Sequence, residues 1–119
     1  MSRVLVVEDE PNIAAIIRFK LEREGHEIVE VDTLAAMTQR LPGFAPDLIL
    51  LDSSLPGEDP LAWLTQERAG NTVVVMTELH DEVAPRKAVA AGAAATVGKP
   101  FKPTQLARLV AELGDPAAG

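Results

Sequence analysis

Carboxylate, hydroxyl and ammonium side chains stand at the ends of short apolar segments of this sequence. Glu8 and Asp9 follow the first of these segments, and Asp52 follows a later one. Thr77 and Lys99 stand after two further segments toward the C-terminus. Three carboxylates that lie close together repel one another, and burial further disfavours their charged forms. A cation would relieve this repulsion, and hard oxygen ligands of this kind suit Mg²⁺.

A lysine and a hydroxyl beside such a cation would add groups that bind an anion. Lys99 supplies a compact positive charge, and Thr77 can donate a hydrogen bond to one of the anion's oxygens. A carboxylate next to Mg²⁺, a lysine and a hydroxyl can act as nucleophile toward a phosphoryl group, which yields an acyl phosphate. The residue types therefore indicate phosphoryl chemistry, provided that the fold brings them together.

The apolar segments that precede these residues have the length and composition of β-strands. Continuous runs of Val, Ile and Leu predict strands buried on both faces at Val4–Val7, Leu48–Leu51 and Val73–Met76. The segment Glu27–Val31 includes charged residues, which is typical of an edge strand. A fifth, weaker strand is expected at Ala95–Val97.

Helical patterns separate the expected strands. Apolar spacing and capping residues predict helices that begin near Pro11, Leu34, Pro60 and Pro85, and a last helix that includes Leu106–Leu113. The second helix is expected to end at Leu41, before Pro42, and the fourth to stop at Gly92.

This alternation of strands and helices defines the expected fold class. Parallel strands joined by right-handed helical crossovers give an α/β, doubly wound sheet with helices on both faces. In such a sheet the carboxyl ends of the strands share one edge, where ligands bind. We therefore expect the five polar side chains to converge there.

Composition limits the other functions that the chain could have. The 119 residues suit one domain, and 47% apolar residues are enough for a core. A net charge of −7 argues against direct binding of nucleic acid. The absence of cysteine excludes disulfides and zinc–thiolate sites. No membrane or targeting segment is apparent in the sequence, so a cytoplasmic location is expected.

Four motifs make the sequence resemble the receiver (CheY-like) domain of two-component response regulators. They are Val-Leu-Val-Val-Glu8-Asp9-Glu, Leu-Ile-Leu-Leu-Asp52-Ser-Ser-Leu-Pro-Gly, Val-Val-Val-Met-Thr77 and Gly-Lys99-Pro100-Phe. The resemblance extends from about Arg3 to Leu113. It implies a flavodoxin-like fold with strand order 2-1-3-4-5, and the spacing of the segments alone does not determine this order.

The resemblance also implies a role for each site residue. Asp52 would accept a phosphoryl group from a sensor histidine kinase or a phosphotransfer protein. Thr77 and Lys99 would bind the oxygens of that phosphoryl group. Mg²⁺ would be held by the side chains of Glu8, Asp9 and Asp52 and by the backbone carbonyl of Ser54. The Lys99–Pro100 peptide bond is expected to be cis.

At the level of the whole chain, the resemblance implies a signalling domain that catalyses only its own phosphorylation and dephosphorylation. Residues 1–113 would form the receiver domain, and residues 114–119 a frayed tail or the start of a truncated linker. Phosphorylation would change an output surface near the last two strands. It would act on a downstream effector domain or protein, with a homodimer possible on activation.

Several positions depart from the family pattern. Thr96 stands where many receivers have an aromatic residue that reports phosphorylation, and Lys102 is a weak cap for the last helix. Glu78 stands where a small residue is usual. Our hypothesis is that Glu78 slows the approach of the phosphoryl group by repulsion and crowding.

Two other functions stay open from the sequence. A pseudo-receiver would keep the fold as a binding module without being phosphorylated. A haloacid dehalogenase-type phosphohydrolase would also use an aspartate nucleophile, Mg²⁺ and a lysine. Such an enzyme needs a second acid two residues after the nucleophile, where Ser54 stands, and usually a cap domain.

Overall fold

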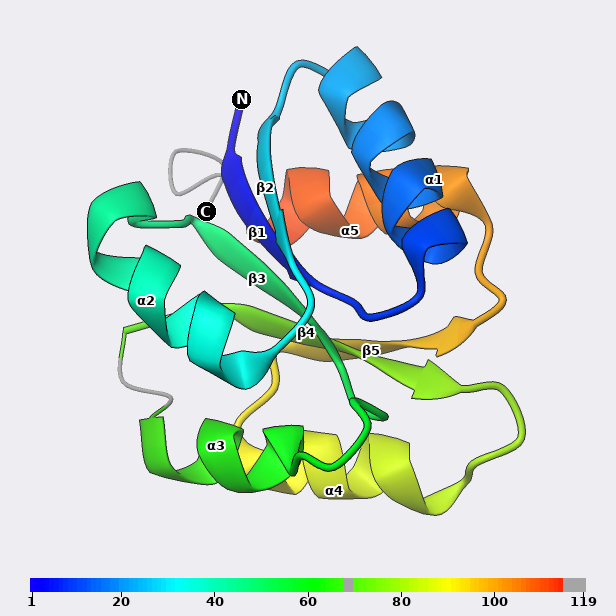
Figure 1. Ribbon diagram of the computed structural model, residues 1–119. Coiled ribbons are helices and arrows are strands. Elements are labelled where there is room, and N and C mark those ends of the chain that lie inside the picture. Colours follow the sequence, from blue (N-terminus) through cyan, green and yellow to red (C-terminus); the bar gives the residue numbers. More distant parts are fainter. Residues whose placement is uncertain (68–69, 115–119) are drawn as a thin grey trace.

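A computed structural model describes residues 1–67 and 70–114 of the chain. Five parallel strands form one sheet in the order β2-β1-β3-β4-β5 (Figure 1). The strands are β1 Arg3–Val7, β2 Glu27–Val31, β3 Leu48–Asp52, β4 Val73–Glu78 and β5 Ala95–Lys99. The expected fold class and strand order are confirmed, and β2 lies at an edge, as its charged residues predicted.

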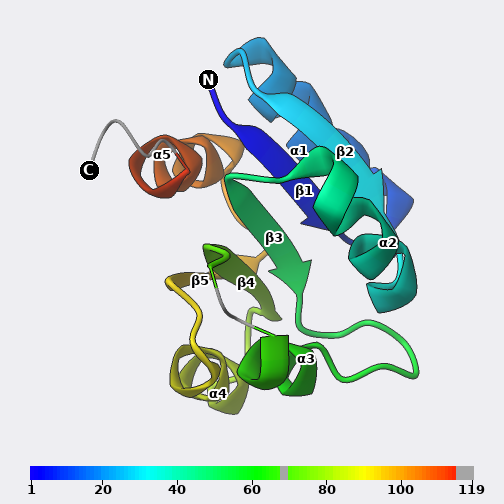
Figure 2. The same cartoon turned by 90° about the vertical axis from the view of Figure 1, so that its left-hand side faces the viewer.

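Helices cover both faces of the sheet (Figures 1 and 2). Their bounds are α1 Pro11–Arg23, α2 Leu34–Phe44, α3 Pro60–Glu67, α4 Val83–Ala91 and α5 Pro103–Leu113. Helices α1 and α5 pack on one face, and α2, α3 and α4 pack on the other. No helix within residues 1–67 and 70–114 is long and apolar enough to cross a membrane.

The sheet therefore separates two hydrophobic cores. Along β1, Val4 and Val6 contribute to the core under α1 and α5, whereas Leu5 and Val7 contribute to the other core. All four side chains are fully buried, and burying one apolar side chain of this size stabilises a fold by about 1.5–3 kcal/mol. A strand that is buried on both faces has no polar position, which explains the continuous apolar runs in the sequence.

Helix α2 extends beyond its predicted end at Leu41. It continues through Pro42 to Phe44, and Ala45 then ends it in the left-handed conformation with φ 48°. The ring of Phe44 is buried and lies 4.6 Å from the Arg3 guanidinium carbon. Burial of Phe44 favours the extra turn despite the preference of a proline to end a helix.

Helix α4 begins at Val83, two residues before the predicted start at Pro85. The Asp81 carboxylate accepts hydrogen bonds from the backbone N–H groups of Val83 and Ala84, both at 2.9 Å. Pro85 therefore lies inside the first turn, where its missing N–H costs no helical hydrogen bond. The predicted stop at Gly92 is confirmed, with φ 116°.

Two predictions concern the ends of other segments. The expected cap of α3 is present, because Asp59 Oδ1 accepts a hydrogen bond of 3.1 Å from the Ala62 N–H. Lys102 makes no side-chain hydrogen bond at the start of α5, as expected for a weak cap. Of the predicted tail at 114–119, residues 115–119 lie outside the described part of the chain.

Candidate phosphoryl-transfer site

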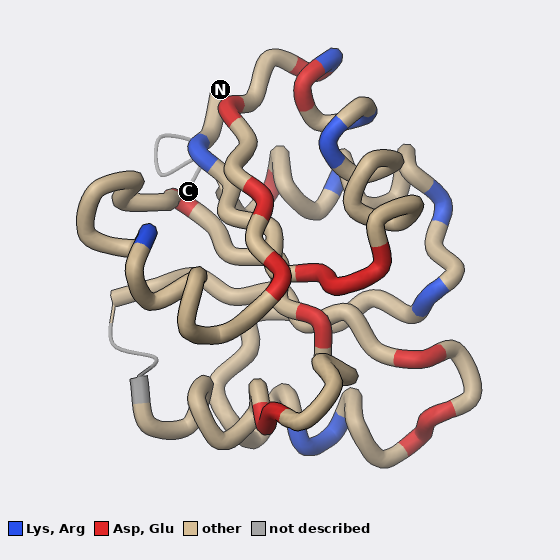
Figure 3. Tube along the Cα trace, in the orientation of Figure 1, with Lys and Arg blue, Asp and Glu red and all other residues tan. Residues whose placement is uncertain are grey.

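The carboxyl ends of the five strands share one edge of the sheet, and the predicted site residues lie along it. Glu8 and Asp9 follow β1, Asp52 ends β3, and Lys99 ends β5. Thr77 is the next-to-last residue of β4, the strand that lies between β3 and β5. Acidic segments gather at this edge in Figure 3. Residues separated by up to 91 positions thus come into contact.

Three carboxylates form the centre of this group. Glu8, Asp9 and Asp52 each offer an oxygen, and these oxygens lie within 4.8 Å of one another. Glu8 and Asp52 are 4% and 1% exposed, whereas Asp9 is exposed to solvent. Two buried acids and one solvent-facing acid form an open-sided set of hard oxygen ligands, which could hold a divalent cation.

Lys99 lies against two of the same carboxylates. Its Nζ atom is 3.2 Å from Asp52 Oδ1 and 3.3 Å from Glu8 Oε2. A third carboxylate oxygen, Glu78 Oε1, lies 3.6 Å from the ammonium group. The ammonium group is thus held within reach of any group that binds Asp52. The Lys99–Pro100 peptide bond is cis, as predicted.

The charges in this cluster are strongly coupled. Burial, followed by the charge of Asp52, raises the pKa of Glu8 to about 7. Desolvation, followed by the nearby Asp52 carboxylate, raises the pKa of Asp9. Burial alone would lower the pKa of Lys99, but the charges of Asp52 and Glu8 raise it above its ordinary value. The edge therefore holds more negative charge than one lysine neutralises.

The two oxygens of Asp52 have different surroundings. Oδ1 accepts a 2.9 Å hydrogen bond from the backbone N–H of Ser54 and faces Lys99. Oδ2 is buried and accepts no hydrogen bond from the part of the chain that the structure describes. A buried carboxylate oxygen without a donor is costly, and a cation beside Glu8 and Asp9 would satisfy it. The residues present therefore fit a Mg²⁺ ion.

Thr77 occupies the strand position between Asp52 and Lys99. Its backbone pairs with Gly98 of β5, while the preceding residue, Met76, pairs with Asp52 of β3. The Thr77 side chain is buried, with 2% of its surface exposed. The register thus places a hydroxyl residue at the same edge of the sheet as Asp52 and Lys99.

Two contacts were not predicted from the sequence. The first is the approach of Glu78 to Lys99, which depends on the register that pairs these two residues across β4 and β5. The second involves His26, which directly precedes β2. Its half-buried ring accepts a 3.0 Å hydrogen bond through Nδ1 from the Ser2 backbone N–H.

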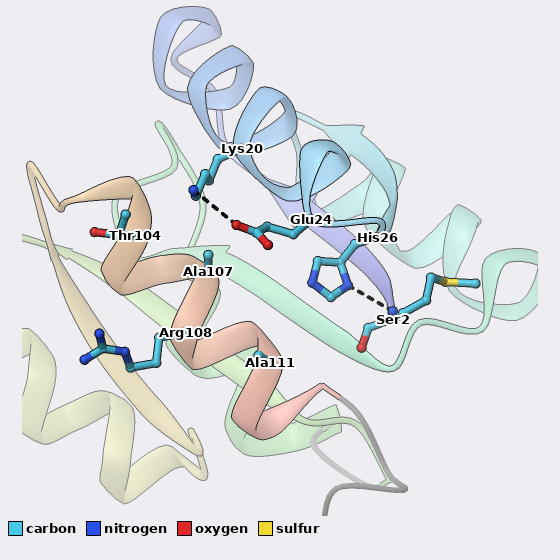
Figure 4. Close-up of a pocket in the computed structure, with 9 residues that line it drawn as sticks. Ser2, Lys20, Glu24, His26, Thr104, Ala107, Arg108 and Ala111 are labelled. Atoms are coloured by element: carbon cyan, nitrogen blue, oxygen red, sulfur yellow. Dashed lines mark hydrogen bonds and ion pairs between the residues drawn. The ribbon is translucent and has the colours of Figure 1, made fainter.

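This histidine lines a pocket between α1 and α5, shown in Figure 4. The pocket lies next to Ser2 and His26, which directly precede β1 and β2, so it is at the opposite edge of the sheet from Asp52. Lys20 forms a 3.1 Å ion pair with Glu24 there. Burial lowers the pKa of His26, which favours the neutral ring that can accept the hydrogen bond from Ser2.

Comparisons with known proteins agree with the fold. The sequence matches the response regulator receiver domain over residues 4–111. It is 36% identical over 109 residues to the phosphate regulon transcriptional regulatory protein PhoB of Escherichia coli. It is 34% identical over 114 residues to the DNA-binding response regulator MtrA of Mycolicibacterium smegmatis.

The chain covers about half of each relative found by sequence but nearly all of the similar solved structure. The chain is covered to 87% and 93% by PhoB and MtrA, but it spans only 48% and 50% of those relatives. It thus has about half the length of the curated relatives that it matches. A crystal structure of a response regulator signal receiver domain from Bermanella marisrubri superposes with a TM-score of 0.87 at 27% identity, covering 95% of this chain and 98% of that one.

Proposed function

Because the chain belongs to the response regulator receiver domain family, we propose that it accepts a phosphoryl group on Asp52 in a Mg²⁺-dependent reaction. The observation on which this proposal rests is the setting of the Asp52 carboxylate. It is buried, its Oδ1 atom lies 3.2 Å from Lys99 Nζ, and its Oδ2 atom accepts no hydrogen bond from the described residues. Two more carboxylates, from Glu8 and Asp9, lie beside it.

The donor would be the phosphohistidine of a sensor histidine kinase or of a phosphotransfer protein. A carboxylate oxygen of Asp52 forms a bond to phosphorus while the phosphorus–nitrogen bond of the donor breaks. The electron pair of that bond returns to the imidazole nitrogen of the donor, and the product is an aspartyl phosphate. The new group adds a charge of about −1.5 to −2 at the edge of the sheet.

The residues that would hold Mg²⁺ are Glu8, Asp9, Asp52 and the backbone carbonyl of Ser54. When bound, the ion would neutralise the clustered carboxylates and polarise the phosphoryl oxygens. Lys99 would exchange its contact with Asp52 for one with a phosphoryl oxygen. The hydroxyl of Thr77 would donate a hydrogen bond to another phosphoryl oxygen. These two residues sit on β4 and β5, so the switched surface would lie near those strands and their helices.

The relatives support a proposal about the partners. PhoB is a transcriptional regulatory protein and MtrA a DNA-binding response regulator. We propose that this chain likewise acts on a downstream effector domain or protein, with a homodimer forming on activation. The acidic receiver domain itself would not bind nucleic acid.

A phosphorylation assay tests the proposal. The chain is incubated with acetyl phosphate and Mg²⁺, and intact-protein mass spectrometry measures the gain of one phosphoryl group. We expect a stoichiometric gain that EDTA prevents and that the Asp52→Asn variant lacks. No gain in the native chain would contradict the proposal and favour a pseudo-receiver.

A phosphate-release assay with a generic phosphate ester tests the enzymatic alternative. A haloacid dehalogenase-type phosphohydrolase would release phosphate continuously from the ester, whereas a receiver would show at most a stoichiometric burst. Ser54 occupies the position of the second acid that such an enzyme needs, and its backbone N–H donates to Asp52. We therefore expect no sustained turnover.

A further inference from the structure

Glu78 contacts the phosphorylation site from a position that the proposed chemistry does not use. It is the last residue of β4, directly after Thr77, and the register pairs it with Lys99 of β5. Its Oε1 atom lies 3.6 Å from Lys99 Nζ, and its side chain is 57% exposed. Lys99 is thus surrounded by three carboxylates, two of them buried and one facing solvent.

The same two side chains line an opening at the surface. A pocket of ≈ 320 Å³ is bordered by Glu78 and Lys99 together with apolar side chains of Ile13, Ile16, Pro100 and Phe101. Lys99 is only 8% exposed and the Glu78 side chain is 57% exposed, so Glu78 is the more accessible of the two charged groups at this pocket. The Glu78 side chain can therefore both repel an anion at this pocket and occupy part of its path to Lys99.

A bound divalent cation would neutralise the charges of the other acids but not that of Glu78. Glu8, Asp9 and Asp52 lie close enough together to share one cation, which would neutralise their mutual repulsion. Glu78 is outside that group, and Lys99 is the cation that it contacts. A phosphoryl oxygen bound at Lys99 would then lie beside the Glu78 carboxylate, which places two negative groups side by side.

From this geometry we propose that Glu78 restrains phosphorylation, an inference that rests on the proposed phosphorylation of Asp52. In the unphosphorylated chain the Glu78 carboxylate pairs with Lys99 and repels the anionic donor. The restraint is modest, because the Glu78 side chain is exposed and water screens its charge. From the range measured for exposed ion pairs, removal of the charge should accelerate phosphorylation about two- to fivefold.

The test measures the second-order rate constant for phosphorylation of Asp52 by small donors at saturating Mg²⁺. Glu78→Gln removes the charge and keeps the shape, Glu78→Ala removes both, and Glu78→Asp keeps the charge. A matched control is Glu82→Gln, which removes another exposed carboxylate four residues farther along the chain. Acetyl phosphate and the less negatively charged phosphoramidate serve as the two donors.

We expect Glu78→Gln and Glu78→Ala to react faster than the native chain, and Glu78→Asp and Glu82→Gln to match it. The gain should be larger with acetyl phosphate than with phosphoramidate, a difference that a purely structural role of Glu78 would not produce. Equal rates for the native chain and Glu78→Gln with both donors would overturn the restraint and leave the proposed function intact.

The remaining outcomes separate the two proposals. If the Glu78 variants gain phosphate and the native chain does not, the restraint stands and the proposed function of the native chain fails. If neither the native chain nor the variants gain phosphate, both proposals are wrong.

Discussion

At the scale of single residues, the ionised Glu8 carboxylate is unfavourable in the fold, because it is buried next to another carboxylate. Its carboxyl is buried between Asp52, which disfavours its charge, and Lys99, which favours it. Burial and Asp52 outweigh Lys99, because the pKa of Glu8 is raised to about 7. The cation-free site is therefore strained by its own charge near neutral pH.

This strain predicts a pH dependence of stability. Between the ordinary pKa of 4.5 and the raised pKa of about 7, the folded chain binds more protons at Glu8 than the unfolded chain does. The free energy of unfolding contributed by Glu8 therefore falls as the pH rises through this window. We expect a loss of about 1–3 kcal/mol between pH 5 and pH 8, measured by urea unfolding in the presence of EDTA.

The Glu8→Gln variant is the control, since its side chain cannot ionise. Its unfolding free energy should lack most of this decline, and the native chain should regain stability at pH 8 when Mg²⁺ is added. A native chain that is equally stable at both pH values in EDTA, with Glu8→Gln unchanged from it, would show that Glu8 is not strained.

The sequence anticipated which side chains would meet but not all of their contacts. Polar residues at strand ends must share an edge in a parallel sheet, so Asp52 and Lys99 were expected to converge, and they lie 3.2 Å apart. Their roles in phosphoryl transfer stay predictions. The contact between Glu78 and Lys99 depends on the β4–β5 register, which apolar periodicity does not specify.

At the scale of elements, the helix ends show what local sequence signals omit. Pro42 and Pro85 were each interpreted as a helix boundary, and each lies inside a helix. In α2 the burial of Phe44 adds a turn, and in α4 the Asp81 side chain caps the helix before Pro85 is reached. Both effects come from contacts of particular side chains, which the general preference of proline for helix ends does not include.

The cap of α4 yields a prediction that separates side-chain from backbone effects. Asp81→Ala removes the acceptor of two N–H groups, those of Val83 and Ala84, and should lower the free energy of unfolding by about 1 kcal/mol. Glu82→Ala should have little effect, because Glu82 holds the cap position without a side-chain hydrogen bond. Urea unfolding of both variants checks this, and equal losses would disprove the assignment of the cap.

The start of α5 offers the opposite change. Lys102 has the extended backbone of a capping residue, with φ −81° and ψ 130°, but makes no side-chain hydrogen bond. The serine of Lys102→Ser should accept a hydrogen bond from a backbone N–H of the first turn. This hydrogen bond should raise the free energy of unfolding by about 0.5–1 kcal/mol. Lys102→Ala is the matched control, since it removes the lysine without adding a cap, and thermal unfolding should rank serine above both.

At the scale of the whole molecule, the sheet divides the apolar interior into two cores that must unfold together. Ile17 of α1 belongs to one core and Ile49 of β3 to the other, and both are fully buried. Strands β1 to β4 contribute side chains to both cores, so we expect neither core to be lost while the sheet remains.

This arrangement predicts additive but cooperative destabilisation. Ile17→Val and Ile49→Val should each lower the free energy of unfolding by about 0.5–1.5 kcal/mol, and the double variant should show their sum within about 0.5 kcal/mol. Trp63, the single tryptophan, packs on the core that contains Ile49. We nevertheless expect Ile17→Val to lower the urea midpoint measured by Trp63 fluorescence as much as the midpoint measured by far-UV circular dichroism. If the fluorescence midpoint of Ile17→Val stays at the native value while the dichroism midpoint falls, the two cores unfold separately and the sheet does not couple them.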